Sequence, residues 1–311
     1  MHSSKNILQS AGAMLDQLEH AKAIECMTNF LRHRYVPNTV CLPPPTRVDR
    51  LQICLACGGS AKRWANFLGT AKHLVDIGKE DCLLQETCNE IASRISISGH
   101  IKVLVDSRNC SPYQAVEGCE LVYRNGDPEE DVAIEVLSNP KVIPVEGADL
   151  LLLMGDVCFS ELAMDHIADS VLSGGSLRVF GRSGLNKDYG NTGGEIFGAY
   201  IPSSEVINIR HFYETCKKLY FGTDRLVMHR YSTWEVLALV TAAGRISGEE
   251  SLSQIIRHPF SLRELLPEMK AALENGDFIE SIWREINDET EDFDFPIEYI
   301  SWLKRRVEKS L

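Results

Sequence analysis

The feature that most constrains the fold is an unbroken apolar run near the middle of the chain. The run follows Asp149, consists of four successive leucines and Met154, and ends at Gly155. Its length is that of a strand rather than that of a helix. A strand at the centre of a parallel sheet is buried on both faces and is therefore apolar throughout, whereas a half-exposed strand alternates. The run thus predicts a central strand of a mainly parallel sheet.

Short strand-like segments and longer helical segments alternate along the rest of the chain. This alternation predicts a sheet covered by helices on both faces. The expected fold class is therefore a three-layer α/β protein with a mainly parallel sheet, and its ligands should bind at the carboxyl ends of the strands. Strands are expected at 51–56, 101–106, 120–123, 149–154, 177–181 and 196–200. Helices are expected at 81–95, 161–172, 210–220, 232–243, 262–274 and 296–309, with Ser160 as the cap of the helix at 161.

A helical segment precedes this α/β region. Between Met14 and Leu31, apolar residues recur at the spacing of a helix, and three successive prolines, Pro43–Pro45, then form a stiff, extended boundary. We therefore expect a helical N-terminal extension with a Pro-rich linker over residues 1–46 and an α/β domain over residues 47–311. The apolar stripe of the extension is expected to pack on the core or to mediate self-association as a homo-oligomer.

Charge and cysteine content narrow the class of protein. Lys and Arg total 32 and Asp and Glu total 44, so the net charge is −12, which disfavours broad nucleic-acid binding. No apolar run approaches the roughly 20 residues of a membrane helix, and the N-terminal residues lack the apolar core of a secretory signal. Of the 10 cysteines, Cys54 and Cys57 form a CxxC pair, but no second pair completes a zinc site. We expect a cytoplasmic protein that binds neither nucleic acid nor a membrane.

A glycine turn follows the first predicted strand. Gly58 and Gly59 let the backbone approach a phosphate closely, and successive free N–H groups there form a cradle for an anion. Arg63 and Lys72 add two positive charges after the turn, and the planar guanidinium of an arginine suits phosphate oxygens. The alternative is an ordinary strand-to-helix turn with two solvated cations. Two cations at the exit of the first strand favour phosphate binding.

Asp156 lies directly after the central apolar run and Gly155. This position is at the edge of the sheet where ligands bind. Mg²⁺ prefers oxygen ligands and commonly uses one or two carboxylates together with substrate phosphates. The alternative is an aspartate that bonds the backbone of its own turn. Position and residue type together favour a metal-binding role.

The segments from Gly58 to Arg63 and from Lys72 to Lys79 resemble the signature of the sugar-nucleotide pyrophosphorylases. That group is related to the molybdenum-cofactor nucleotidyltransferases and to other enzymes with a GT-A-like fold. In the family, the glycine loop holds the triphosphate, and an arginine and a later lysine contact the phosphates. The resemblance therefore implies a nucleotidyltransferase-like α/β fold and makes Arg63 and Lys72 the expected catalytic residues. It implies nucleotide binding by Ala56, Gly58, Gly59, Ser60, Arg63, Lys72 and Asp156.

The same resemblance extends to a segment near the end of the chain. The sequence from Glu291 to Tyr299 is similar to the segment that closes the family's fold and returns a second metal ligand, which by this match is Asp294. Asp156 matches the family's first metal ligand, so the resemblance implies an Mg²⁺ site shared by Asp156 and Asp294. The alternative is a helix that starts with acidic residues. Pro296 suits the first helical position, so Asp294 lies one residue too early to be the cap, and the helix-start interpretation stays open for Asp292.

A polar loop rich in glycine runs from Gly181 to Glu195. Recognition of a sugar needs many short polar contacts, so this loop is the candidate site for an acceptor. Arg182 would bind a sugar phosphate, and Glu195 would bind hydroxyl groups. A solvated surface loop is the equal alternative.

These features predict a metal-dependent nucleotidyltransferase that joins a nucleoside triphosphate to a phosphorylated small molecule, such as a sugar 1-phosphate, and releases pyrophosphate. Two alternatives stay open. One is a GT-A-type glycosyltransferase that uses a nucleotide-sugar, although its usual Asp-x-Asp motif does not occur at Asp156. The other is a non-catalytic nucleotide-binding module, because Ala61 and Ala71 stand where the resembled family has glycine and proline.

Overall fold

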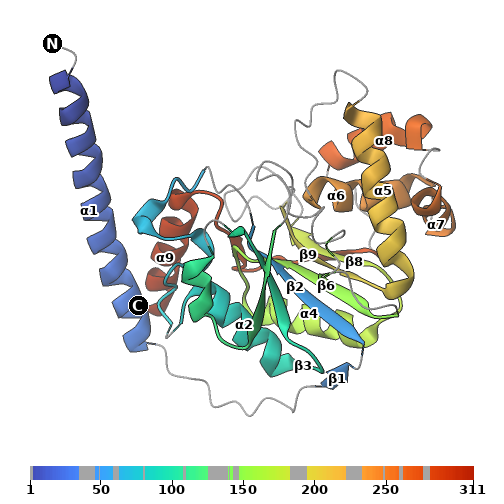
Figure 1. Cartoon of the computed structure of the whole chain (residues 1–311), viewed down its shortest axis with the longest axis horizontal. Coiled ribbons are helices and arrows are strands. Elements are labelled where there is room, and N and C mark those ends of the chain that lie inside the picture. The colour runs from blue at the N-terminus through green and yellow to red at the C-terminus, as the bar shows by residue number, and fades with distance from the viewer. Residues whose placement is uncertain are drawn as a thin grey trace.

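A twisted sheet with helices on both faces forms the body of the protein, and a long N-terminal helix projects from one side (Figure 1). This computed structural model describes residues 3–34, 46–48, 50–58, 63–79, 81–107, 110–124, 139, 141–142, 147–182, 195–221, 233–247, 249–258, 262–275 and 281–311. Within these residues, no helix has both the length and the apolar character needed to cross a membrane.

The main sheet has seven described strands in the order β10-β8-β9-β6-β2-β4-β5. Strand β9 runs antiparallel to both of its neighbours, and every other neighbouring pair is parallel. The prediction of a mainly parallel sheet is therefore confirmed, with the apolar run forming the inner strand β6. The strands are β2 (Leu51–Ala56), β4 (Ile101–Val105), β5 (Cys119–Tyr123), β6 (Asp149–Met154), β8 (Arg178–Arg182), β9 (Glu195–Ile201) and β10 (Trp283–Glu285).

The four leucines of β6 explain why both faces of the sheet are covered. Successive side chains of a strand point to opposite faces, and all four leucines are buried. Leu151 and Leu153 pack toward α2 and α4, whereas Leu150 and Leu152 belong to the core formed with α5, α6, α7 and α8. The helices are α2 (Leu83–Arg94), α4 (Glu161–Ser173), α5 (Ser203–Phe221), α6 (Thr233–Ser247), α7 (Glu249–Arg257) and α8 (Leu262–Glu274). Ser160 caps α4 as predicted, since its side chain accepts a hydrogen bond from the Ala163 N–H.

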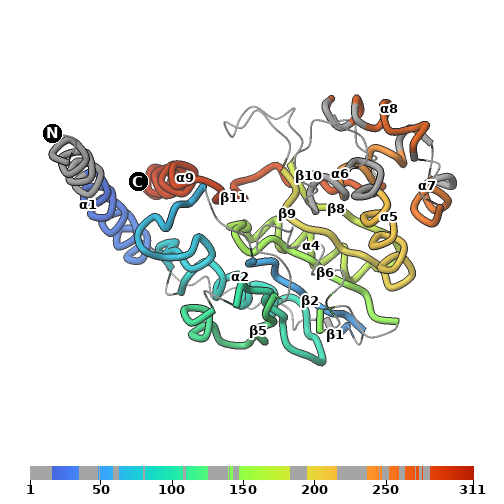
Figure 2. The backbone as a smooth tube through the Cα atoms, turned by 45° about the horizontal axis from the view of Figure 1, so that its top comes forward, coloured from blue at the N-terminus to red at the C-terminus, as the bar shows by residue number. Residues whose placement is uncertain are grey.

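A third core joins the two ends of the chain. Helix α1 (Ser3–Arg34) lies beside α9 (Pro296–Ser310), as both views show (Figures 1 and 2). Ile24 and Leu31 of α1 are buried with Trp302 of α9, whereas Leu18 is 54% exposed. Leu31 lies so close to Gly78 that a Cβ at Gly78 would come within 2.6 Å of the Leu31 Cβ. The C-terminal part of the predicted extension therefore shares a core with the rest of the protein, while the division into domains stays a prediction.

Several short elements have no counterpart among the predicted ones. Two parallel strands, β1 (Thr46–Val48) and β3 (Ile95–Ile97), form one ribbon. Two antiparallel strands, β7 (Val157–Cys158) and β11 (Glu291–Asp292), form another. Strand β10 and helix α7 were not predicted either, and further short elements among the described residues are the 3-10 turns η1 (Phe67–Gly69), η2 (Lys72–Leu74) and η4 (Ser111–Ala115). The β7–β11 ribbon matters most, because it brings the C-terminal segment to the end of β6.

Candidate functional site

The β7–β11 ribbon brings acidic residues from distant parts of the chain together. Asp156 lies in the turn between β6 and β7, and in the ribbon Asp292 pairs with Val157, the next residue along. The Phe293 N–H also donates a hydrogen bond of 3.1 Å to the Asp156 carbonyl oxygen. Asp294 follows at the end of the same segment, one residue before the cap of α9. The site therefore lies at the carboxyl end of the central strand.

Three aspartates meet at this point. Asp156, Asp292 and Asp294 each offer one carboxylate oxygen, and these oxygens all lie within 4.8 Å of one another. The sequence interpretation expected Asp156 and Asp294 to converge, and the structure brings them together. It left Asp292 as an acid at a helix start, whereas Asp292 lies in β11 and is the third member of the cluster. The signal in the sequence was the Asp-x-Asp spacing of Asp292 and Asp294, of which only Asp292 lies in β11.

Two basic side chains neutralise part of this cluster. The Lys72 ammonium is ion-paired with Asp156 and lies 3.0 Å from Asp294 Oδ1. Arg63 is ion-paired with the other oxygen of Asp294, and its guanidinium stacks over the ring of Phe295 at 5.3 Å. The Lys72 side chain is only 11% exposed, whereas that of Arg63 is 61% exposed. Both predicted catalytic residues therefore lie at the aspartate cluster, with Lys72 enclosed and Arg63 open to solvent.

The charges at the site perturb one another strongly. Burial raises the pKa of Asp292 well above its usual range, and the neighbouring Asp156 and Asp294 raise it further. Burial also opposes ionisation of Asp156, but the Lys72 ammonium, through its charge and its hydrogen bond, outweighs burial and lowers the pKa of Asp156. The three aspartates likewise outweigh burial at Lys72 and raise its pKa. Among the described residues, no hydrogen-bond partner reaches the buried Asp292 Oδ1.

A buried histidine, His73, directly follows Lys72 in the turn η2. His73 Nδ1 shares a hydrogen bond of 2.7 Å with the hydroxyl group of Tyr113, and both residues are buried. Burial lowers the pKa of His73 to about 4, so this side chain is neutral at pH 7. The pair therefore supports the turn that carries Lys72 and adds no charge of its own.

The ends of β2 and β6 approach each other too closely for a side chain between them. A Cβ at Gly155 would lie 2.2 Å from Cys57 Sγ and 3.3 Å from the Ala56 carbonyl oxygen. That oxygen also accepts a hydrogen bond of 3.1 Å from the Gly155 N–H. Glycine is therefore required at position 155, and Ala56 and Gly58 lie at the same edge of the sheet as the aspartates. Gly59 and Ser60 lie outside the described residues.

Arg124 is a further cation at this edge that the sequence interpretation missed. It directly follows β5, its side chain is buried, and its Cδ would lie 2.6 Å from a Cβ at Gly58. Its N–H also hydrogen-bonds the Val105 carbonyl oxygen at 3.0 Å, which fixes the backbone at the end of β4. A basic residue directly after a predicted strand was the available signal, since strand ends carry ligand contacts in sheets of this kind.

Arg182 and Glu195, the predicted acceptor residues, lie beside the C-terminal segment. Arg182 is 1% exposed and lies 3.4 Å from Glu195 and 3.9 Å from Glu291. It also donates hydrogen bonds to the carbonyl oxygens of Asp288 and Thr290. Arg182 therefore ties the segment before β11 to the sheet. The loop between Arg182 and Glu195 lies outside the described residues, and the acceptor role of both residues stays a prediction.

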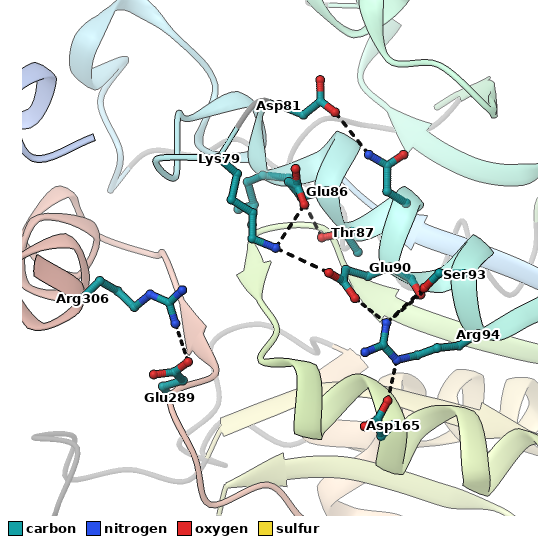
Figure 3. Close-up of polar contacts among 12 residues, drawn as sticks. Lys79, Asp81, Glu86, Thr87, Glu90, Ser93, Arg94, Asp165, Glu289 and Arg306 are labelled. Carbon is teal, nitrogen blue, oxygen red and sulfur yellow. Dashed lines mark hydrogen bonds and ion pairs between the residues drawn. The ribbon is translucent and has the colours of Figure 1, made fainter. Parts of the chain in front are cut away.

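A separate cavity of about 490 Å³ lies among α2, α4 and α9, and none of the three aspartates lines it. Figure 3 shows its ion pairs: Lys79 contacts Glu86 at 3.1 Å and Glu90 at 3.4 Å, and Arg306 contacts Glu289. Each of these charged groups has a partner of opposite charge inside the protein. We therefore place the functional site at the aspartate cluster.

Comparison with known proteins finds similarity among solved structures only. No family model matches the chain, and no curated protein matches it. The structure is similar to UDP-glucose pyrophosphorylase in complex with UDP-glucose, with a TM-score of 0.49, 10% sequence identity, and coverage of 84% of this chain and 100% of the other. The apo form of UDP-glucose pyrophosphorylase gives a TM-score of 0.47 with the same identity and coverage. CTP:phosphocholine cytidylyltransferase from Streptococcus pneumoniae gives a TM-score of 0.43 with 12% sequence identity, and the match covers 82% of this chain and 99% of the other.

The TM-scores of these matches are below 0.5 and their sequence identities are 10–12%, so none of them supports a conclusion about function. The function proposed below therefore rests on the geometry of the site.

Proposed function

We propose that this protein is a metal-dependent nucleotidyltransferase. It would join a nucleoside triphosphate to a phosphorylated small molecule, such as a sugar 1-phosphate, and release pyrophosphate. The observation that carries the proposal is the convergence of three carboxylates with Lys72 and Arg63 at the carboxyl edge of the sheet. Carboxylates that hold a cation, next to basic groups that hold phosphates, are what a triphosphate site needs.

The residues present fit a divalent cation. Asp156, Asp292 and Asp294 supply only oxygen atoms, which is the donor set that Mg²⁺ prefers. The buried Asp292 Oδ1 has no hydrogen-bond partner among the described residues, and a buried carboxylate oxygen without a partner is costly unless a ligand satisfies it. When bound, Mg²⁺ would offset the charge of the triphosphate and of the transition state.

The basic residues of the chain would bind and orient the triphosphate. Arg63 is 61% exposed, and its planar guanidinium can bind two phosphate oxygens at once. Lys72 would supply a point charge from beneath the phosphates. The glycine turn that begins at Gly58 would contribute backbone N–H groups. These contacts would place the α-phosphorus in line with an acceptor.

The reaction itself would need no general base. The phosphate group of the acceptor is already ionised at pH 7, and one of its oxygens would attack the α-phosphorus. The bond between the α-phosphorus and the oxygen bridging to the β-phosphate breaks, and pyrophosphate leaves with the electron pair. Catalysis would then consist of positioning and of charge stabilisation by Arg63 and Lys72.

The acceptor is expected near Glu195. The Glu195 side chain is 18% exposed, whereas Arg182 is 1% exposed and surrounded by protein groups. Glu195 is therefore better placed to contact acceptor hydroxyl groups, with Arg182 holding Glu195 in position.

A glycosyltransferase that uses a nucleotide-sugar is the second candidate. The structure brings an Asp-x-Asp pair, Asp292 and Asp294, to the end of the central strand, which is where such enzymes hold their metal. A nucleotide-sugar has a diphosphate, so it would occupy the same cations and carboxylates. Only the ligand preference separates these two candidates.

A thermal-shift panel of nucleoside triphosphates and nucleotide-sugars, each with and without Mg²⁺, tests the proposal. A ligand at 100 times its Kd stabilises the folded state by about 2.7 kcal/mol. We expect a triphosphate to raise the melting temperature only with Mg²⁺, and Asp156→Asn to remove the shift. Asp165→Asn is the control, because Asp165 lies on α4 and is 55% exposed. A shift with nucleotide-sugars alone would favour the glycosyltransferase, and no shift with any of them would refute nucleotide binding.

A further inference from the structure

The position of Lys72 gives this side chain a second role. Its ammonium contacts Asp156 and Asp294 at the same time, and two carboxylates that converge in this way are where a bound cation would lie. We propose that Lys72 is a built-in cation of the free protein, which a divalent cation displaces when it arrives together with a polyphosphate. The ligand of the site is then the metal–triphosphate complex rather than the free metal ion. This inference rests on the proposed function.

Lys72 occupies the place between Asp156 and Asp294 that a divalent cation would need. Mg²⁺ binds oxygen at about 2.1 Å, so two of its ligand oxygens lie at most about 4.2 Å apart. An ammonium donates to carboxylates at about 2.7–2.9 Å, so it can join oxygens that are farther apart. The oxygens of the cluster all lie within 4.8 Å of one another, and the Lys72 ammonium contacts two of the three carboxylates. A divalent cation bound to the same two carboxylates would therefore have to take the place of the ammonium.

The local charges make the displacement costly unless Lys72 gains a new partner. Among the described residues, two basic side chains are ion-paired with the three carboxylates, and of these Arg63 is mostly exposed and therefore well screened. Lys72 is 11% exposed, so a free metal ion that displaced it would leave a buried ammonium without a counter-charge. Triphosphate oxygens would supply that counter-charge. The flexible four-carbon stem of lysine allows the short movement from carboxylate to phosphate.

This exchange predicts coupling between metal and phosphate. A free divalent cation must compete with Lys72, whereas the metal–triphosphate complex brings its own partner for Lys72. The affinity for the metal should therefore rise when triphosphate is present, and by linkage the affinity for triphosphate should rise equally when metal is present. Replacing Lys72 with a neutral side chain should remove the competitor and so strengthen the binding of the free ion.

Isothermal titration with Mn²⁺ alone, on the full chain without nucleotide, tests the exchange directly. We expect Lys72→Met and Lys72→Gln each to bind free Mn²⁺ at least about tenfold more tightly than the wild type, within the usual range of couplings. Lys72→Arg keeps a cation and should bind Mn²⁺ as weakly as the wild type. The matched control is Lys79→Met, because Lys79 is also partly buried, at 18% exposure, and also contacts two carboxylates, Glu86 and Glu90. Its Mn²⁺ affinity should not change.

The stability of the variants provides a second readout. Without Lys72 the three carboxylates repel one another, so Mn²⁺ alone should raise the melting temperature of Lys72→Met more than that of the wild type. Folding of Lys72→Met only in the presence of Mn²⁺ would support the same conclusion. Equal or weaker Mn²⁺ binding by both neutral variants would overturn the exchange.

The two proposals fail in different ways. If the wild type binds triphosphate with metal but Lys72→Met gains no affinity for free Mn²⁺, the exchange is wrong and the proposed function stands. If no triphosphate binds to the wild type under any condition, the proposed function is wrong, whatever Mn²⁺ does alone.

Discussion

Replacing Asp292 with asparagine should stabilise the protein in the absence of metal. Among the described cations, none is ion-paired with Asp292, since Lys72 and Arg63 are paired with Asp156 and Asp294. Its Oδ1 is buried without a hydrogen-bond partner among the described residues. Asparagine keeps the shape of the side chain and removes the charge. An ionised Asp292 is thus a cost that the free protein bears for a ligand.

Burial is the larger cause of the raised pKa of Asp292, and the separation of the carboxylates sets the size of the repulsion that adds to it. Oxygens within 4.8 Å of one another repel by about 1 kcal/mol in bulk water and by about 3 kcal/mol at the effective dielectric constant of a protein surface. Lys72 and Arg63 offset two of the three charges, so about one such repulsion remains for Asp292. We therefore expect Asp292→Asn to raise the free energy of unfolding by about 1–3 kcal/mol at pH 8.

The pH dependence of this gain has a definite sign. The folded pKa of Asp292 is raised above its unfolded value, which is about 3.9. The wild-type carboxyl group is therefore protonated and harmless in both states well below pH 4, and its cost develops as the pH rises from the unfolded pKa toward the raised folded pKa, above which it levels off. The advantage of asparagine should be largest at pH 8 and vanish near pH 4.

Urea unfolding in EDTA, followed by circular dichroism at pH 4 and pH 8, measures both quantities. Asp165→Asn serves as the control: this exposed aspartate accepts a hydrogen bond from Arg94, so its loss should cost up to about 1 kcal/mol. An Asp292→Asn variant that is less stable than the wild type at pH 8 would refute the reasoning, because asparagine would then have removed a favourable interaction.

Three further predictions concern the residues that support the site and the packing of α1. Because the pKa of buried His73 is about 4 against about 6.5 when unfolded, the contribution of His73 to stability should fall by up to about 3 kcal/mol from pH 6.5 to 4. Urea titrations that compare the wild type with His73→Gln at each pH should show this change in their difference, and a difference that does not vary with pH would contradict burial as its cause. Gly155→Ala should lower the free energy of unfolding by about 1–3 kcal/mol through its clash with Cys57 Sγ, and adding Cys57→Ala should restore most of that loss, whereas no rescue would place the strain elsewhere. Leu31→Ala should cost about 2–4 kcal/mol in the same assay, since Leu31 is buried against α9 and η1; a negligible change would mean that α1 does not dock as described.

The sequence predicted the parts of the fold that short stretches of chain determine. The leucines of β6 are apolar because both of their faces are covered, and Ser160 caps α4 through a hydrogen bond only three residues away. The position of Asp156 was predictable for a related reason, whereas Asp294 was expected beside it only from the resemblance. Strand ends of a parallel sheet share one edge, so a polar residue after a buried strand can be placed before its neighbours are known.

Other features depend on contacts between residues far apart in the sequence. The ribbon strands β7 and β11 have two residues each, and such short pieces carry no periodicity that a sequence can reveal. Since this ribbon is what brings Asp292 beside Asp156, the third aspartate was missed with it. The antiparallel direction of β9 could not be predicted either, because the apolar residues of a strand do not show which way it runs relative to its neighbours. The contact of Lys72 with carboxylates was missed for another reason: the resemblance assigns that lysine to phosphates, which the free protein lacks.

Release of pyrophosphate tests the proposed function most directly. The assay combines the wild-type protein with Mg²⁺, each nucleoside triphosphate in turn, and a panel of sugar 1-phosphates. We expect release with at least one pair, and a loss of at least about 100-fold in Asp156→Ala and in Asp294→Ala, with nucleotide binding weakened less. Asp165→Ala should keep the wild-type rate. Release that persists in both aspartate variants, or triphosphate binding by the wild type without release for any acceptor tested, would contradict the proposed catalytic role of this site.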